Sequence, residues 1–295
     1  GIVLHEIDCR EAFREKVEMA TVREYEKLRI PNPCVFCNSQ IKFKYLAECA
    51  RRLGIDKIST GHYVKVFKNP QNSRICLAAA DDKKKDQSYF LWQVSQEDLA
   101  MFYSTLESEE KSDVVKKLVE TTSLNLAGES QEICFIPNDD RISFLKEKMD
   151  SEMLEKLFAK GAFVDIHGKR VGEHNGLIRY TPGQRKGLGI ALGQPAYVLS
   201  LDLDKNEVKV GFAQDNVCTG FAVSSLSFVS VPEFEGTISC KVRTRHRGRL
   251  FEALVKIEKG RAAVELITPD KTVSKGQSAV FYDDDQKVLF GGIID

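Results

Sequence analysis

Residues 38–63 read NSQIKFKYLAECARRLGIDKISTGHY, and this stretch decides the fold class. Apolar side chains recur at helical spacing from Ile41 to Leu53, and Gly54 is predicted to end that helix. Residues 55–60 then read as a short strand that runs into a glycine loop. A helix, a strand and a glycine loop in this order are typical of an α/β domain, in which ligands bind at the edge where the strands end.

Two groups of cysteines lie far apart on either side of this unit. The first, Cys34 and Cys37, follows Pro31 and Pro33, which are predicted to end the preceding helix and to stiffen a loop that carries both thiols. The second group is Cys134 alone. A thiolate is both a strong nucleophile and a soft metal ligand. If the fold brings the two groups together, the chain could carry sulfur, break a persulfide or hold a metal.

The composition excludes several classes of protein. The chain has 295 residues, enough for two or three domains, and its 43 basic and 43 acidic residues create no overall field that attracts nucleic acid. The apolar runs are too short to span a bilayer, and the first residues lack the pattern of a secretion signal. Eight cysteines in this length are not a dense disulfide framework. We therefore expect a cytoplasmic protein with free thiols and no membrane association.

The pattern changes near residue 140. One helical segment is expected over residues 144–158, and short alternating strands with glycine turns follow it. The second half is therefore predicted to be mainly β, with small barrels and hairpin loops at residues 202–206 and 283–287. The predicted strands cover residues 196–201, 207–212, 222–229, 237–247, 253–257, 262–267 and 278–281.

Each cysteine also has a structural interpretation. A Cys-x-x-Cys pair occurs in zinc sites, redox pairs and iron–sulfur sites, and here no second pair completes a four-cysteine site. Cys134 lies in an apolar run that could be a buried strand with an inert thiol. The other five cysteines are predicted to be structural, namely Cys9, Cys49, Cys76, Cys218 and Cys240.

Three polar segments could bind nucleic acid or could simply be surface. Gly61 and His62 follow the predicted strand, where a glycine lets backbone approach a nucleotide closely and a histidine can contact phosphate or a base; the alternative is a turn. Residues 81–89, DDKKKDQSY, form a polar loop of a kind that is usually just solvated. Residues 180–189, YTPGQRKGLG, add a basic, glycine-rich surface whose glycines could equally serve turn geometry alone.

The strongest basic signal is KVRTRHRGR at residues 241–249. Every odd position is basic, so an extended strand would line one face with these side chains. Phosphate groups could neutralise such a row, and pairing with acidic side chains on neighbouring strands is the alternative. We favour contact with nucleic acid.

Taken together, these segments resemble the tRNA-specific 2-thiouridylases, which place sulfur at C2 of the wobble uridine of certain tRNAs. The resemblance runs in the family's order across nearly the whole chain. The matching stretches are PNPCVFCNSQIKF at 31–43, STGHYVKV at 59–66, KDQSYFL at 85–91, SQEICFIPND at 130–139, GEHNGLIRYTPGQRKGLGI at 172–190 and GQSAVFYDDDQKVLFGGII at 276–294.

The resemblance implies three domains. Residues 1–140 would form a partial α/β nucleotide-binding and catalytic domain of the PP-loop type, residues 141–217 a central α+β domain that contacts tRNA, and residues 218–295 a C-terminal β-barrel. It implies a tRNA-uridine 2-sulfurtransferase that uses ATP with Mg²⁺, acts on tRNA and receives persulfide from a sulfur-relay or cysteine desulfurase protein. A monomer is expected.

The resemblance also assigns catalytic roles. ATP would adenylate the C2 oxygen of the uracil, and a persulfide would then attack C2. Cys134 would carry the persulfide, while Cys37 would release the sulfur or form a disulfide bond with Cys134. Low pKa values of both thiols would help these steps. The target uridine must leave its stack, so a base-flipping pocket is expected beside the cysteines.

The remaining implied sites bind nucleotide or tRNA. Gly61 matches a contact to ATP. The positions that match tRNA contacts are Asn32, Pro33, Cys34, His62, Lys85, Asp86, Gln87, Arg243, Thr244 and Gln277.

Two departures from the family pattern leave alternatives open. The Ser-Gly-Gly-x-Asp-Ser phosphate loop of the family is not found in this sequence. The chain is therefore expected to be N-terminally incomplete, or to be a tRNA-binding remnant without adenylation activity. In either case it is expected to bind ATP poorly. Many family members also carry Asp where this chain has Cys34. With Cys34, Cys37 and Cys134, a [4Fe–4S] cluster is an alternative to persulfide relay, and a zinc-stabilised RNA-binding protein is a further one.

Overall fold

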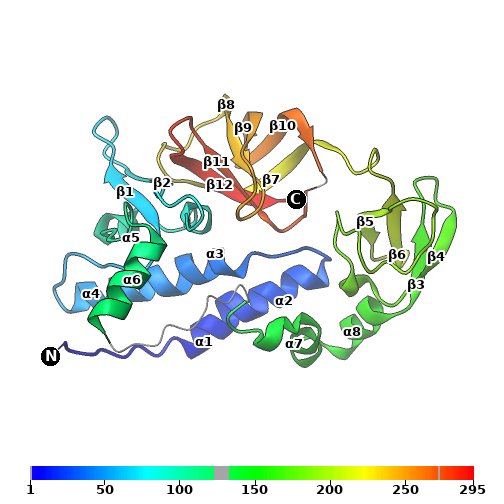
Figure 1. Ribbon diagram of the computed structural model, residues 1–295, viewed down its shortest axis with the longest axis horizontal. Coiled ribbons are helices and arrows are strands. Elements are labelled where there is room, and N and C mark those ends of the chain that lie inside the picture. Colours follow the sequence, from blue (N-terminus) through cyan, green and yellow to red (C-terminus); the bar gives the residue numbers. More distant parts are fainter. Residues whose placement is uncertain (1, 123–132, 272) are drawn as a thin grey trace.

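The computed structural model describes residues 2–122, 133–271 and 273–295. Figure 1 shows three bodies: a helical N-terminal domain with a small sheet, a closed barrel packed above its long helices, and a central domain at the other end. The order of an α/β-type domain, a central domain and a C-terminal barrel was predicted, and the structure confirms it.

Two long helical segments form the base of the N-terminal domain. The first runs through α1 (Arg10–Phe13), the π-helical turn η1 (Arg14–Glu18) and α2 (Met19–Glu26), as predicted. The second runs through α3 (Pro33–Cys37), the π-helical turn η2 (Asn38–Phe43) and α4 (Lys44–Arg52), and Gly54 follows it in a left-handed conformation.

The predicted cysteine loop is wrong, because Cys34 and Cys37 lie in α3. Proline is favoured at the first helical position, since the N–H that it lacks would have no partner inside the helix. Pro33 occupies that position and therefore starts the helix instead of keeping the segment in a loop. The two thiols are held on a rigid helical turn.

The predicted strand at residues 55–60 is also wrong. Within it only Ile58 forms a β-bridge: its N–H donates to the Met101 carbonyl (2.9 Å), and its carbonyl accepts from the Tyr103 N–H (2.8 Å). This produces one isolated parallel bridge between Ile58 and Phe102 and no ladder. The described sheet of this domain is instead the hairpin of β1 (Val64–Lys68) and β2 (Ile75–Ala79).

Three helical elements complete the described part of this domain. The 3₁₀ turn η3 (Ser88–Phe90) and α5 (Gln96–Met101) follow β2, and α6 (Lys111–Thr121) covers the hairpin side of the molecule in Figure 1. Ser95 caps α5 by accepting a hydrogen bond from the Asp98 N–H.

The central domain begins with helices and ends in a sheet. The single helix predicted over residues 144–158 is two helices, α7 (Arg141–Lys148) and α8 (Ser151–Phe158). Asp150 separates them because it is extended and its side chain accepts the N–H of Met153, which caps α8. The 3₁₀ turns are η4 (Pro137–Asp139) and η5 (Leu177–Arg179). The sheet has the order β4-β3-β6-β5 and comprises β3 (Gly161–Val164), β4 (Arg170–His174), β5 (Tyr197–Asp202) and β6 (Glu207–Gly211).

The C-terminal barrel closes in the order β10-β7-β12-β11-β8-β9. Strand β9 shows strict alternation of buried and exposed residues, as expected for a wall with one face on a core. Its strands are β7 (Cys218–Phe228), β8 (Gly236–Arg243), β9 (Phe251–Glu258), β10 (Arg261–Asp270), β11 (Ser278–Tyr282) and β12 (Val288–Ile294).

The row of basic residues does not form one strand face. Val242 pairs with Phe251 across a hairpin, so β8 must stop at Arg243 and the chain must reverse before β9 begins. The reversal places Arg247 in a left-handed conformation (φ +57°). The prediction of an extended strand over residues 237–247 is therefore wrong beyond Arg243.

The barrel and the N-terminal domain share one hydrophobic core. Trp92 is fully buried, and its indole N–H donates to the Ser278 hydroxyl (3.1 Å). A Cβ atom at Gly291 would lie 2.5 Å from the Trp92 ring, so the barrel strand approaches the indole as closely as a glycine allows. The Tyr89 hydroxyl also donates to the Ser278 carbonyl (2.9 Å). These contacts fix the barrel directly above the helical segment that begins with α3 and carries Cys34 and Cys37, here called the cysteine helix (Figure 1).

Candidate active site and tRNA interface

The fold brings the two groups of cysteines together. The side chain of Phe135, which follows Cys134, packs in the same apolar cluster as Cys37. The ring of Phe135 also makes an edge contact with Phe13 on α1, with ring centroids 5.5 Å apart. Cys134 lies near enough to Cys34 and Cys37 that its charge raises the pKa of both thiols. Residues distant in the sequence thus bring the three thiols within electrostatic range of one another.

The three thiols differ in accessibility. Cys37 is buried among Val17, Ile41 and their neighbours, whereas Cys34 and Cys134 are exposed. Partial removal of the sulfur atoms from water raises the pKa of Cys37 and, although part of its side chain reaches the surface, that of Cys34; the positive charge of Lys42 acts in the opposite direction. The expectation of a low pKa is therefore not met for Cys37. All eight cysteines are free in this structure, so the disulfide bond expected between Cys37 and Cys134 stays a prediction.

Lys42 is a residue that the sequence analysis missed. It lies five residues after Cys37, in the wide π-helical turn η2, and its side chain is exposed. Its ammonium group lowers the pKa of Cys34, Cys37 and His62. The lysine is visible in the sequence, but its position beside the thiols depends on the helical path that Pro33 begins.

We expect Lys42→Met to slow alkylation of Cys37 at neutral pH by about 3- to 10-fold, because losing the nearby cation raises the thiol pKa and each pKa unit changes the thiolate fraction tenfold. Iodoacetamide labelling followed by peptide mass spectrometry over a range of pH measures the rate at each cysteine. Lys44→Met is the matched control, since Lys44 is also exposed on the same helix and is not among the groups that shift either pKa. Equal rates in the two variants would contradict the effect.

His62 lies inside the site rather than on its surface. Its Nδ1 atom hydrogen-bonds to the Thr60 hydroxyl (2.7 Å), and its Nε2 atom to the Asn38 side-chain oxygen (3.1 Å). Burial and then the charge of Lys42 lower the pKa of His62 to about 4. Both ring nitrogens are used within the protein, so the ring positions Asn38 on the cysteine helix. A tRNA contact by His62 stays a prediction.

The low pKa of His62 makes stability depend on pH. In the unfolded chain this histidine has a pKa of about 6.5, so as the pH falls it takes up a proton before the folded protein does. The free energy of unfolding therefore decreases between about pH 6.5 and pH 4, by up to about 3 kcal/mol. Urea unfolding at pH 7 and at pH 4.5 measures this loss. His62→Gln should flatten that part of the profile, whereas His167→Gln at an exposed position should not. An unchanged profile in His62→Gln would show that another group causes the loss.

Gly61 is exposed and lies in open space. No atom outside its chain neighbours comes within 4 Å of a Cβ placed there, and its φ is not left-handed. The fold therefore does not require glycine at this position. Because neither packing nor backbone conformation requires glycine here, the absence of a side chain fits the predicted close approach of a nucleotide. Contact between Gly61 and ATP stays a prediction.

Two predicted tRNA contacts, Asp86 and Arg243, bind each other. The Arg243 guanidinium donates to Asp86 (3.2 Å) and stacks on the Tyr282 ring (5.1 Å). Asp86 is almost fully buried and also accepts hydrogen bonds from the Ser88 N–H and hydroxyl, both 3.0 Å. The alternative of acidic pairing thus applies to Arg243. It applies equally to two others of the basic row: Lys241 pairs with Asp284 and Arg249 with Asp270.

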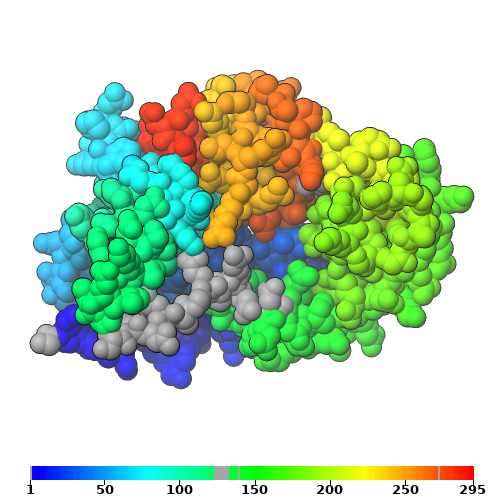
Figure 2. All heavy atoms as spheres, viewed as in Figure 1, coloured from blue at the N-terminus to red at the C-terminus, as the bar shows by residue number. Residues whose placement is uncertain are grey.

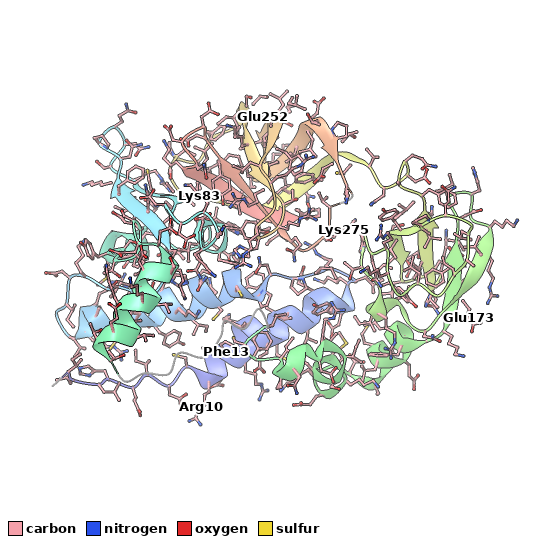
Figure 3. The ribbon with its side chains drawn as sticks, viewed as in Figure 1. Arg10, Phe13, Lys83, Glu173, Glu252 and Lys275 are labelled. Carbon is pink, nitrogen blue, oxygen red and sulfur yellow. The ribbon has the colours of Figure 1, made fainter. Side chains whose placement is uncertain are left out.

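A basic cleft of about 560 Å³ opens beside this ion pair. Residues of both the N-terminal domain and the barrel line the cleft, and Asp86 is the one acidic residue among them. The lining residues are Lys83, Lys84, Lys85, Asp86, Arg243, Arg247 and Gly248. Figure 2 shows the yellow-orange barrel loop reaching toward the cyan segment of the N-terminal domain, and Figure 3 places Lys83 on that segment. The three consecutive lysines are visible in the sequence, but the sequence does not show that they line the same cleft as a loop of the barrel.

Of the other predicted tRNA contacts, Gln277 ties the barrel to the segment that leads into α3, and Gln87 bonds within the N-terminal domain. The Gln277 side-chain amide donates to the carbonyls of Ile30 (2.9 Å) and Pro31 (3.3 Å), and Gln277 and Thr244 line one small cleft of about 170 Å³. The Gln87 side-chain oxygen accepts the Tyr63 N–H (3.0 Å).

The residues at the start of the cysteine helix are tied to the same interface. Asn32 hydrogen-bonds through its side chain to Tyr89, and Pro33 is buried at the first position of α3.

No group of three His, Cys, Asp or Glu side chains among residues 2–122, 133–271 and 273–295 is arranged to hold a metal ion. The [4Fe–4S] and zinc alternatives thus gain no support from the arrangement of the described cysteines. Across the same residues, no helix has the length and apolar character needed to cross a membrane.

Known families match the chain in three consecutive parts. Residues 1–138 match the family described as tRNA methyl transferase HUP domain, residues 144–212 the tRNA methyl transferase PRC-barrel domain, and residues 218–294 the aminomethyltransferase beta-barrel domain.

Individual relatives match over the whole chain. A tRNA-specific 2-thiouridylase MnmA 2 of Thermoanaerobacter sp. (strain X514) is 38% identical, and an MnmA 1 of Caldanaerobacter subterraneus subsp. tengcongensis is 39% identical; in both, the match covers 100% of this chain and 80% of the relative. An MnmA 2 of Syntrophus aciditrophicus (strain SB) is 37% identical over 324 residues, which cover 100% of this chain and 91% of the relative. With Cys34 and Cys37 on a helix under a C-terminal barrel, with Cys134 in a nearby turn, and with relatives this similar along its full length, the chain belongs to the family of tRNA-specific 2-thiouridylases.

Proposed function

We propose that this protein is a tRNA-uridine 2-sulfurtransferase that replaces the C2 oxygen of a tRNA uridine with sulfur. The observation that carries the proposal is the meeting of Cys134 with Cys37, an exposed thiol beside a buried one. The curated relatives named above are tRNA-specific 2-thiouridylases, which supports this reaction class.

The different exposure of the two thiols supports different roles. A persulfide donor protein must reach the thiol that it loads, and Cys134 is exposed. Cys37 is buried beside it on a rigid helix, where a second protein would not reach it but a neighbouring sulfur atom would. We therefore assign the persulfide to Cys134 and the internal nucleophile to Cys37, with a sulfur-relay or cysteine desulfurase protein as the donor.

The proposed reaction has two sulfur steps. The terminal sulfur of the Cys134 persulfide attacks C2 of the activated uridine; a C–S bond forms and the C2–O bond breaks, with the oxygen leaving on AMP. The Cys37 thiolate then attacks Sγ of Cys134. This step breaks the S–S bond to the transferred sulfur, leaves that sulfur on C2, and joins Cys37 to Cys134 in a disulfide that an external thiol must reduce.

ATP supplies the activation that turns the C2 oxygen into a leaving group. Of the residues in this chain, Gly61 fits a nucleotide contact, because open space surrounds it at the end of the segment that positions His62. The surrounding groups hold the site still: His62 fixes Asn38, and Gln87 fixes Tyr63.

The basic cleft supports tRNA as the substrate. Lysine and arginine side chains from two domains face one opening, which suits a phosphate backbone that passes from one domain to the other. In this arrangement Arg243 is positioned by Asp86 and Tyr282, and it reaches the cleft already oriented.

The proposal is tested by measuring 2-thiouridine in total tRNA from cells that lack the gene, by nuclease digestion and mass spectrometry. We expect the nucleoside to disappear and to return when the full-length gene is restored. Unchanged 2-thiouridine in the deletion strain, with no second gene of the family present, would reject the sulfurtransferase function and leave tRNA binding as the remaining activity.

A further inference from the structure

The central domain contains a basic loop that the reaction site does not use. Residues 185–193 read RKGLGIALG and connect η5 to β5. Arg185 and Lys186 are exposed, and neither forms an ion pair with any residue that the structure describes. By contrast, Lys160 and Arg170 of the same domain both pair with Glu173. The loop therefore presents two cations whose charge nothing in the described fold neutralises.

The backbone of this loop also presents unused hydrogen-bond donors. Among the described residues, no protein acceptor receives a hydrogen bond from a backbone N–H between positions 185 and 193. Gly187 (φ +76°) and Gly189 (φ +68°) are left-handed on either side of Leu188. Unpaired backbone N–H groups of glycine-rich turns are donors that proteins use to bind anions. In the free protein water satisfies these donors.

The loop is rigid although it lacks secondary structure. The Gly183 N–H donates to the Val198 carbonyl (2.7 Å), and the Val198 N–H donates back to the Gln184 carbonyl (2.9 Å). The Gln184 side chain accepts the Thr181 N–H (3.0 Å) and donates to the Lys186 carbonyl (3.0 Å).

Apolar side chains anchor the rest of the loop. Leu188 is buried in the domain core, with Ile190 and Leu192 packed against it. The cations and glycines are thereby held outward without the entropy cost of ordering a mobile segment.

The glycines of the loop leave room for a ligand. A Cβ at Gly189 or Gly193 would meet no atom within 4 Å, and one at Gly187 would meet only the Gln184 side chain at 3.9 Å. The space over this backbone is therefore open, and a phosphate oxygen could approach the N–H groups directly. Turn geometry explains the positive φ values of the glycines, but it does not account for exposed, unpaired cations next to unused backbone donors.

We propose that residues 185–193 form a preorganised phosphate-binding loop that contacts the sugar–phosphate backbone of the tRNA, in addition to the basic cleft. The proposal rests on the proposed function for the identity of the RNA. Backbone N–H groups with arginine and lysine are the donors that proteins use for phosphate contacts without reading sequence.

The location of the loop suits a contact along one tRNA. Figure 1 shows the central domain at the opposite end of the molecule from the β1–β2 hairpin, with the barrel between them. Pro182, just before the loop, lines a cleft of about 360 Å³ together with Ile30 and Lys275, next to the segment that leads into the cysteine helix. Lys275 points into the region between barrel and central domain in Figure 3. An RNA bound at both basic sites would extend from the N-terminal domain to the central domain.

The test compares tRNA binding by the full-length protein and by Arg185→Gln/Lys186→Gln, using a fluorescent, unmodified tRNA transcript and anisotropy at several KCl concentrations. We expect Kd at moderate salt to rise about 10-fold and the slope of log Kd against log salt to fall by about 1–2, as for the loss of two phosphate contacts. The matched control is Lys169→Gln/Lys209→Gln, which removes the same charge from exposed positions of the same domain; its slope should stay at the wild-type value.

A second variant separates backbone from charge. Gly189→Ala keeps the charge of the loop, strains the left-handed backbone at this position and adds a methyl group in the open space over the loop. We therefore expect weaker binding with an unchanged salt slope. Circular dichroism melting confirms that each variant is folded. Wild-type Kd and slope in the double variant would overturn the loop proposal while leaving the sulfurtransferase intact. Failure of the wild-type protein to bind tRNA at all would overturn both.

Discussion

Replacing Cys134 with serine in the full-length protein is expected to abolish 2-thiouridine formation while leaving tRNA affinity within about twofold of wild type. A hydroxyl cannot carry a persulfide, so no sulfur would reach C2, and an exposed side chain outside the basic cleft contributes little to phosphate binding. Thiolation is measured by mass spectrometry of digested tRNA, and binding by anisotropy. Residual thiolation at more than a few per cent of the wild-type rate would contradict the role of Cys134.

Cys37→Ser separates the two sulfur steps. Loading of Cys134 needs only an exposed thiol, so this variant should still gain the mass of one sulfur atom when incubated with the donor protein and cysteine. It should nevertheless release no thiolated tRNA, because the buried nucleophile is absent. Cys218→Ser, in the barrel, is the control and should keep full activity. Multiple turnovers by Cys37→Ser would show that an external thiol performs the second step and that Cys37 has only a packing role.

Asp86→Ala is expected to lower the free energy of unfolding by about 3–5 kcal/mol, the usual cost of leaving one member of a buried ion pair without its partner. The Asp86 side chain is 4% exposed and that of Arg243 is 15% exposed, so the guanidinium would be left with little solvation and without its carboxylate partner. Asp86 also holds Ser88, whose hydroxyl lies 3.3 Å from that of Tyr282, so the loss affects the contact between barrel and N-terminal domain. Urea unfolding followed by tryptophan fluorescence measures the effect, because Trp92 lies at that contact.

The double variant Asp86→Ala/Arg243→Met distinguishes the ion pair from general packing. With both charges removed, no unpaired charge remains buried, and we expect a substantial part of the stability to return. Arg243→Met alone should weaken tRNA binding in addition, because Arg243 lines the basic cleft. Additive losses in the double variant would mean that the two side chains act independently, and the positioning role of Asp86 would be wrong.

The sequence alone determined the order of domains and the elements that depend on local rules. Alternating apolar residues predicted β5, β6 and much of the barrel, and helical spacing from Ile41 to Leu53 predicted the second long helix of the N-terminal domain. It failed where two local rules compete. Pro33 read as a helix breaker, but it stands at the first position of a helix, where proline is favoured. Residues 55–60 have the pattern of a strand, yet a strand needs a partner along its whole length, and only Ile58 has one.

The sequence also identified the chemical groups, but only the tertiary structure decided what they do. Cys134 and Cys37 are recognisable as thiols in the chain; their approach depends on Phe135 packing against α1 and the cysteine helix. The basic row around Arg243 was expected to meet phosphate directly, whereas chain reversal after β8 turns Arg243 onto Asp86 and leaves Arg247 at the cleft. Periodicity reports which side of an element a residue occupies. The partner on that side, and hence the charge and accessibility of the residue, is set by contacts between segments far apart in the chain.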